Sequence, residues 1–396
     1  MILNLYNFFI YVTIFFIFVE NFIIRSINVS TILLFIISFV LYFFYRFNKG
    51  FYGIFNLNIY LIILYFITLA ICSIYNSTFI PIIFGILAIM YYVYIFWHTH
   101  DQLKKVIDIS SKILCFILIL AFISLIYFEL GGPSFGQVSG RSWYLFSLFT
   151  SSSNGPLRAS GIFFEPGQFS FYICAICACR EFLKFDTKIT YFLLILGSIT
   201  YSVAHFFFMF IFFIYKFSSF KFVFSEKGLA ISLILFLFTT FSISFGFFNP
   251  VLERSISISQ DPFEYQRFNS FQYALNLLDY DIKNYIYGPS NDLAARKLND
   301  AQILGTTNQA SVYGENPLTP IVFGGLLASW PYYLLIIYAI IQIFTFKKSA
   351  LLFFGFICLT LQRPYTLEFP YTIIVAIVLF LYISTSHKNV RVIQKI

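Results

Sequence analysis

The residues best suited to chemistry lie in the stretch RASGIFFEPGQFSFY, Arg158 to Tyr172. It sets a positive charge, Arg158, and a negative charge, Glu165, on either side of a short apolar run. A guanidinium can hold a phosphate or carboxylate through paired hydrogen bonds, and a carboxylate can accept a proton from a hydroxyl. The stretch therefore predicts an anion-binding surface with a general base. The alternative is a helix cap beside an arginine that reaches lipid headgroups.

Composition shows what kind of chain must position these charges. Hydrophobic residues make up 60% of the sequence, charged residues 11%, and Phe alone occurs 57 times. Such a composition is typical of an all-α polytopic membrane protein, here a single transmembrane domain over residues 1–396. About twelve spans are expected: Ile2–Val19, Thr31–Phe44, Ile54–Ile74, Ile80–Trp97, Ile113–Phe128, Pro166–Phe182, Ile189–Tyr201, Ala204–Tyr215, Gly228–Phe247, Leu318–Phe344, Ala350–Leu361 and Tyr371–Ser384.

Charge distribution predicts the topology of these spans. With both termini in the cytoplasm, sixteen of the 25 Lys and Arg residues fall on the inner face, as membrane proteins with short loops require. The net charge of +8 then faces anionic lipid, and nucleic acid is not needed as a partner. Seven of the ten Arg nevertheless fall outside, which favours recognition of phosphate or carboxylate. Ordinary ion pairs with the outer acidic residues are the alternative.

Two long outer loops point to function on the same face. The first, residues 129–165, leads to the opening stretch, and the second, residues 248–317, is too long for a simple connection. Short helices are expected in the second loop, where QRFNSFQYALNLL places apolar residues on one helical face: Phe268, Phe271, Leu275 and Leu278. Pro331 predicts a kink in the tenth span.

The candidate site collects polar residues from several parts of this outer face. Glu315 is the first candidate for a general base and Glu165 the second, because both stand beside prolines at the start of a span. The candidate substrate-binding residues are Arg158, Arg254, Arg267, Arg363, Asn316 and His205. His205, at the turn between the seventh and eighth spans, serves equally well as a hydrogen-bonded residue at a helix end.

Other chemistries lack support in the sequence. The six Cys lie within spans, so CAICAC, Cys174 to Cys179, is read as small-residue helix packing in preference to a metal site. The remaining His are on the inner side and form no zinc pattern. There is no phosphate-binding loop and no GxSxG motif. Neither a metal nor a cofactor is expected.

Several features together resemble a known family. They are an R-x-x-G-x-x-x-E-P motif (Arg158, Gly161, Glu165, Pro166), a TYS turn, and a large outer loop that ends in Asn-Pro before a glycine-containing span. Their layout along about twelve spans resembles O-antigen polymerases of the Wzy type. The resemblance covers most of the chain by topology and short stretches by residue. Repeated R-x10-G motifs, described for some members, are not found at the outer Arg residues.

The resemblance implies a GT-C-like glycosyltransferase bundle in the bacterial inner membrane, with a large periplasmic loop and an active site facing the periplasm. The implied reaction passes a growing chain from undecaprenyl diphosphate to a sugar hydroxyl of the next lipid-linked repeat unit, without a metal. Membrane lipids and a chain-length regulator protein are the further partners it implies. An O-antigen ligase or another lipid-donor glycosyltransferase is one alternative, although loop 248–317 lacks the His that ligases carry there. A flippase is the other, although it should have two similar halves with short loops.

Overall fold

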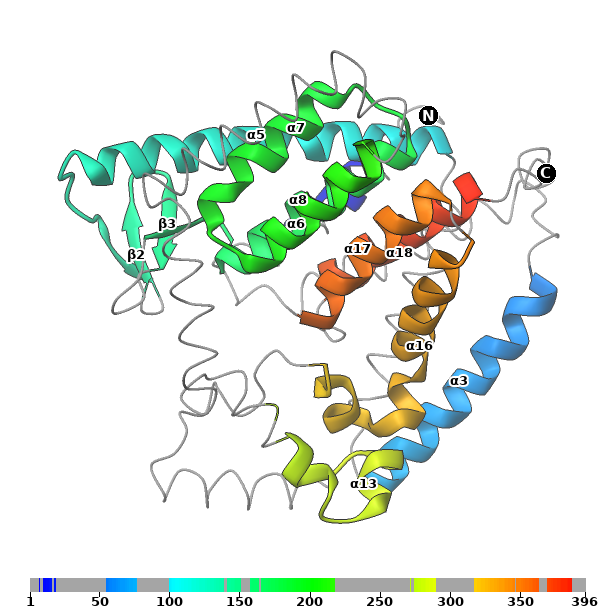
Figure 1. Cartoon of the computed structure of the whole chain (residues 1–396). Helices are drawn as coiled ribbons and strands as arrows, with labels where there is room; N and C mark the ends of the chain where they lie inside the picture. The colour runs from blue at the N-terminus through cyan, green and yellow to red at the C-terminus, as the bar shows by residue number, and fades with distance from the viewer. Residues whose placement is uncertain are drawn as a thin grey trace, which may run out of the picture.

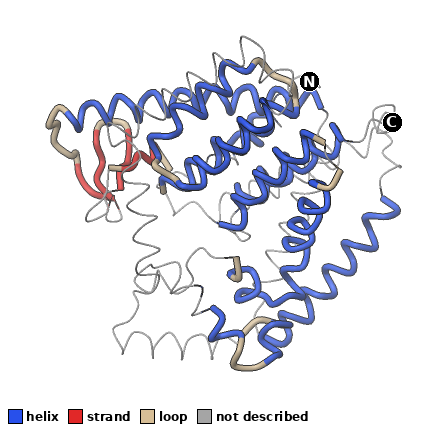
Figure 2. Tube along the Cα trace, viewed as in Figure 1, coloured by secondary structure: helices blue, strands red, loops and turns tan. Residues whose placement is uncertain are grey.

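The computed structural model describes residues 7, 10–15, 18, 55–76, 100–138, 141–150, 157–163, 165–217, 271, 274–289, 317–345, 347–362 and 369–386. Most of these residues are helical, and the described strands form one small sheet (Figures 1 and 2). The mostly helical fold agrees with the prediction from composition.

One group of helices surrounds a central one. The central helix is α6, Pro166–Phe182, and every one of its residues is buried. Its neighbours are α5 (His100–Glu129), α7 (Thr187–Leu196) with the short 3-10 helix η2 (Gly197–Thr200), α8 (Val203–Phe217), α17 (Lys348–Gln362) and α18 (Phe369–Ser386). Figure 1 shows these helices side by side, with α5 as the longest of the group.

The sequence of α6 explains its central place. The run from Cys174 to Cys179 consists of Cys, Ala and one Ile, all fully buried, so neighbouring helices can approach closely. The Cys177 thiol contacts the backbone oxygen of Thr190 on α7 at 3.8 Å. Toward its first turns, α6 carries larger rings, and Phe171 stacks on Tyr371 of α18 at 5.0 Å. The predicted small-residue packing of this segment is confirmed.

The helix boundaries follow the apolar segments closely. Each of the helices α6, α8, α17 and α18 begins and ends within two residues of a predicted span. The seventh and eighth segments are separate helices, divided at Tyr201 and Ser202. The exception is α5, which begins at His100 and so includes charged turns that precede the predicted span from Ile113.

Two of the described helices are long and apolar enough to cross a membrane. They are His100–Glu129 and the part of α16 from Gly324 to Ile343. The described chain also has shorter apolar helical stretches, of 10–17 residues: Leu64–Tyr75, Thr187–Thr200, Val203–Phe217, Lys348–Leu361 and Ile373–Thr385. By length and composition, the two long helices are compatible with a helical membrane protein.

A second group of helices packs at the start of α16. It contains α3 (Phe55–Asn76), α13 (Ile282–Tyr287) and α16 (Thr319–Ile343). A small apolar cluster joins the helical turns before α13 to the first turn of α16: Ala274, Leu277, Leu278, Ile321 and Val322. Within the predicted apolar face, Leu278 is buried, Leu275 is only partly buried, and Phe268 lies outside the described residues.

Helix α16 is broken at Gly325, whereas Pro331, the site of the predicted kink, keeps helical backbone angles. Gly325 takes φ 65° and ψ 178°, a conformation that a side chain would disfavour. A Cβ atom there would also lie 2.2 Å from the backbone oxygen of Ile286, so α13 approaches α16 backbone to backbone. The carbonyl of Gly324 next to the break accepts a hydrogen bond from the Cys72 thiol of α3 at 3.2 Å. Close approach of α13 explains a break that the proline pattern did not predict.

Gly325→Ala should undock α13. The new methyl group would meet backbone atoms of Ile286 and Gly288, which cannot move aside without α13, and the positive φ adds about 1–2 kcal/mol of strain. We expect faster trypsin cleavage at Lys283, measured by mass spectrometry. Gly131→Ala is the matched control, because Gly131 also has positive φ, 79°, but nothing within 4 Å. Equal cleavage rates in the two variants would contradict this docking.

The first long loop contains a four-stranded antiparallel sheet that the sequence did not predict. Its strands are β1 (Gly136–Val138), β2 (Arg141–Tyr144), β3 (Ser147–Thr150) and β4 (Arg158–Gly161), in the order β1-β2-β3-β4. Each strand has only three or four residues, too few to show the alternation by which strands are recognised. The sheet packs against α5, with β4 also on α6. An all-α description is therefore incomplete.

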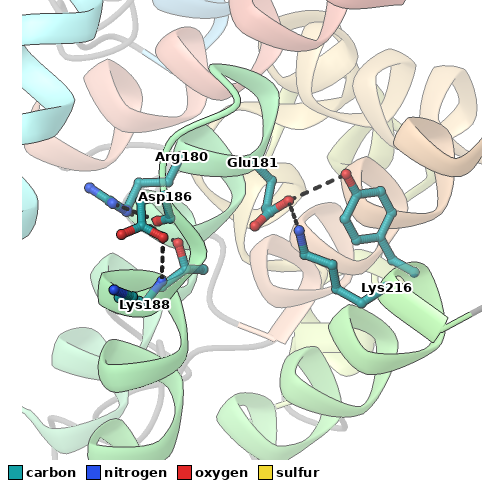
Figure 3. A network of polar contacts seen from close by, with 7 residues as sticks. Arg180, Glu181, Asp186, Lys188 and Lys216 are labelled. Atoms are coloured by element: carbon teal, nitrogen blue, oxygen red, sulfur yellow. Dashed lines mark hydrogen bonds and ion pairs between the residues drawn. The ribbon is translucent and has the colours of Figure 1, made fainter. Parts of the chain in front are cut away.

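A polar network ties α5, α6, α7 and α8 together at the C-terminal end of α6. Figure 3 shows the part of it around Arg180 and Glu181. Arg180 is 1% exposed and donates to Ser111 Oγ at 2.8 Å, Thr190 Oγ1 at 3.1 Å and the Asp186 backbone oxygen at 2.9 Å. Glu181 pairs with Lys216 Nζ of α8 at 2.5 Å. The connection between α6 and α7 and the first turn of α7 carry further basic residues, Lys184 and Lys188.

Lys216→Met should destabilise the protein strongly. The Glu181 side chain is 5% exposed, and a buried carboxylate that loses its partner costs about 3–5 kcal/mol. Adding Glu181→Gln should restore most of that loss, because no charge then stays buried. Unfolding by denaturant in detergent micelles measures both. Lys188→Met, at an exposed position, is the control, and a single Lys216 variant as stable as this control would rule out the pairing.

Candidate functional site

The candidate site lies at the end of α6 where the helix begins. This end is opposite the Arg180 network. The elements near it are the sheet, the end of α5, η2 and the start of α8. Of the residues predicted for the site, the structure describes Arg158, Glu165 and His205. Arg254, Arg267, Glu315, Asn316 and Arg363 lie outside the described residues.

Glu165 occupies the N-cap of α6, and Pro166 fills the first helical position, as predicted. Proline loses no hydrogen bond there, and its ring favours the helical φ. The Glu165 side chain makes no capping hydrogen bond, so its carboxylate is directed elsewhere while it remains beside the positive end of the helix dipole. Two residues before it, Phe163 is fully buried and stacks on Phe169 at 4.8 Å, which fixes the chain direction into the helix.

Arg141, and not Arg158, pairs with Glu165. Arg141 Nη2 lies 3.2 Å from Glu165 Oε1, and the two side chains are 14% and 31% exposed. Arg141 begins β2, so the sheet brings it across 24 residues of sequence to the N-cap of α6. Arg141 is not among the site residues predicted from the sequence, in which nothing distinguishes it from other arginines. Only the pairing of the strands singles it out.

Arg158 is fixed by a different contact. It begins β4, and its Nε donates to the backbone oxygen of Thr200 in η2 at 3.1 Å. This contact helps to set the orientation of the planar guanidinium group. Arg141 and Arg158 are thus both held on the sheet, one toward α6 and the other toward η2.

The TYS turn beside Arg158 is strained. Tyr201 has φ 44° and ψ 39°, a left-handed conformation that is uncommon for a bulky residue and clusters at functional sites. Its amide donates to the Ser198 oxygen at 2.9 Å. A phenol is protonated at neutral pH, so the Tyr201 hydroxyl can donate a hydrogen bond.

His205 is a packing residue in this structure. It is fully buried, its Nε2 lies 2.7 Å from the Leu194 backbone oxygen, and its Nδ1 lies 3.5 Å from the Cys174 thiol. A carbonyl can only accept, so Nε2 carries the proton and Nδ1 accepts from the thiol. Gly197 makes room for the ring, since a Cβ there would lie 2.5 Å from His205 Cε1. His205 thus joins α6, α7 and α8 below the TYS turn and serves the helix-end role that the sequence left open.

This arrangement can bind an anion but offers few ligands for a metal. Two guanidinium groups, a helix N-terminus and a protonated phenol all favour negative charge. Among the described residues, no group of three His, Cys, Asp or Glu side chains could hold a metal ion. Comparisons of the chain with protein-family models, curated proteins and solved structures gave no match. Function must therefore be inferred from the geometry and from the sequence.

The Arg141–Glu165 pair should be worth more than an exposed ion pair. We expect a double-mutant cycle with Arg141→Gln and Glu165→Gln to give a coupling free energy of about 1 kcal/mol, because the pair is partly buried. The matched control is Lys112 with Asp108, at 65% and 35% exposed, for which about 0.3–0.5 kcal/mol is expected. Denaturant unfolding measures both cycles. A smaller coupling for Arg141 and Glu165 than for the control would contradict the contact.

Proposed function

We propose that this chain is a polytopic membrane glycosyltransferase that polymerises lipid-diphosphate-linked oligosaccharides, as its resemblance to O-antigen polymerases of the Wzy type implies. It has about twelve spans, cytoplasmic termini and a site on the periplasmic face of the bacterial inner membrane. The donor is a growing chain on undecaprenyl diphosphate, and the acceptor is a sugar hydroxyl of the next lipid-linked unit.

The observation that carries this proposal is the gathering of Arg141, Arg158 and Glu165 at the first turn of α6. Both arginines are held by the sheet, and the carboxylate stands at the N-cap of a helix that is buried along its length. This is the R-x-x-G-x-x-x-E-P stretch of the resemblance, now with a second arginine beside it. A diphosphate leaving group needs positive charge of this kind.

The reaction assigns distinct tasks to these groups. The acceptor hydroxyl attacks the anomeric carbon of the donor sugar, the bond from that carbon to the diphosphate oxygen breaks, and the hydroxyl proton passes to a base. Arg158, with Arg254, Arg267 and Arg363, stabilises the negative charge on the departing diphosphate. No metal is required for that stabilisation.

Glu315 is the better candidate for the base. Arg141 and the dipole of α6 both stabilise Glu165 as an anion, which makes it a weaker proton acceptor. In that position Glu165 serves to hold Arg141 and to shape the electrostatic field. The preference for Glu315 that its sequence position suggested is therefore kept.

A purified-protein assay tests the function. Liposomes containing the protein receive a lipid-diphosphate oligosaccharide and no other acceptor, and the products are separated on a gel. We expect a ladder of polymers with release of lipid diphosphate, unaffected by a metal chelator. A ligase would require a different acceptor, and a flippase would move the lipid without lengthening the sugar. Substrate that remains unchanged in length would count against polymerisation.

Substitutions in the same assay separate the roles. Arg158→Ala should lower the rate about 100-fold to 1,000-fold, the usual effect of removing one charge-stabilising donor. Glu315→Gln should abolish polymerisation, whereas Glu165→Gln should leave measurable activity. Lys188→Ala, at the opposite end of the bundle, is the control for expression and folding. If all four arginine variants kept wild-type polymer length and yield, diphosphate binding by these residues would be wrong.

A further inference from the structure

We infer that the β1–β4 sheet lies at hydrocarbon depth in the membrane, beside the outer part of α5, with its apolar turns in contact with lipid. This inference rests on the proposed function only in requiring that α5 crosses a bilayer. The proposed reaction does not fix the depth of the sheet.

The contacts between the sheet and α5 give the depth of the sheet. The amide of Phe146, at the β2–β3 turn, donates to Ser124 Oγ at 3.0 Å. Gly161, at the end of β4, packs so tightly on α5 that a Cβ would lie 2.7 Å from Ile117 Cγ2. At 1.5 Å per residue, Ser124 lies about 8 Å and Ile117 about 18 Å below the helix end at Glu129. The β2–β3 turn is therefore beside the outer part of α5, and the end of β4 reaches about the middle of its apolar segment.

The length of the apolar part of α5 supports the same depth. Between Lys112 and Glu129 the helix has no charged residue, and these sixteen positions span about 24 Å. A bilayer core is about 30 Å thick. Hydrocarbon that begins near Lys112 therefore reaches the outer end of α5, and any element beside Ile117 and Ser124 lies at hydrocarbon depth.

The turns of the sheet have the composition of a lipid-facing surface. The two residues that connect β2 and β3 are Leu145 and Phe146, where turns in water favour Gly, Asn and Asp. Leu145 even adopts a positive φ of 50°, and its backbone oxygen accepts a hydrogen bond from the Trp143 indole at 2.9 Å. Phe146 is 47% exposed. An exposed turn made of Leu and Phe would be costly in water, whereas it is favourable in lipid.

Exposed apolar residues occur both on α5 and in the segment that follows it. On the helix, an outward stripe consists of residues at helical spacing: Phe116, Ile119, Phe122, Ile123 and Ile126. Beyond the helix lie Leu130, 82% exposed, and Phe135, 64% exposed, whose ring stacks on Tyr127. No charged residue occurs from Leu130 to Gly140. One solvent therefore covers both surfaces, and for α5 that solvent is lipid.

An edge strand limits how deep in the hydrocarbon the sheet can lie, because unpaired backbone groups are not tolerated there. Of the two edge strands, β4 packs on α5, α6 and η2, which leaves β1 as the edge to be placed. We therefore place β1 at the headgroup level, with Leu130, Phe135 and Phe146 toward the acyl chains. The sheet then holds Arg141, at the start of β2, near the depth of lipid phosphates.

Photocrosslinking of the full chain tests the inference. Phe135 and Phe146 are replaced singly by benzoylphenylalanine, and each protein is reconstituted in phosphatidylcholine vesicles, irradiated and analysed for lipid adducts by mass spectrometry. Phe122, on the exposed stripe of α5, is the positive control. Tyr280 is the aqueous control, because it is 68% exposed between Asp279 and Asp281.

We expect lipid adducts at Phe122, Phe135 and Phe146 in comparable yield and at least several-fold less at Tyr280. Adducts at Phe122 alone would overturn the depth of the sheet while leaving the membrane span of α5 in place. Crosslinks from Phe135 and Phe146 to other parts of the chain would overturn it too. If Phe122 itself gave no adduct, the failure would lie in the proposed span. Because the label replaces one phenylalanine with a larger aromatic residue, Phe135→Leu and Phe146→Leu are run alongside to confirm that folding is retained.

Discussion

Burial of α6 on every side is the constraint on which the described structure depends. Five helices and a strand surround seventeen residues, and this is possible because small side chains in the second half of α6 allow close approach. A helix buried in this way can carry charge only near its ends. At one end Arg180 donates hydrogen bonds to α5 and α7 and Glu181 pairs with Lys216 of α8, and at the other Glu165 stands at the N-cap.

The two ends of α6 are polar for different reasons. At the Arg180 end, neutral hydroxyl and carbonyl groups surround one guanidinium, and the carboxylate of Glu181 has its own lysine. That arrangement fixes the four helices relative to one another. At the Glu165 end, Arg141 of β2 pairs with Glu165 at the N-terminus of α6, and Arg158 of β4 bonds to η2. Guanidinium groups and a helix N-terminus suit an anionic ligand.

The backbone at the Glu165 end is unusual in two places. Leu145 and Tyr201 both have positive φ. Leu145 follows β2, the strand that begins with Arg141. Tyr201 follows Thr200, whose backbone oxygen accepts the hydrogen bond from Arg158. Side-chain contacts secure each turn: the Trp143 indole bonds to Leu145, while His205 fills the space below Tyr201. The surrounding packing thus supports conformations that short peptides would avoid.

The sequence by itself determined most of the described helices and the start of α6 at Pro166, because long apolar runs and a proline act locally. It predicted Arg158 and Glu165 as neighbours in function but could not pair them correctly. The pairing of Glu165 with Arg141, the break at Gly325 and the sheet itself were decided by the tertiary structure. Each depends on contacts between distant residues, such as strand register or backbone approach, which leave no periodic signal in the sequence.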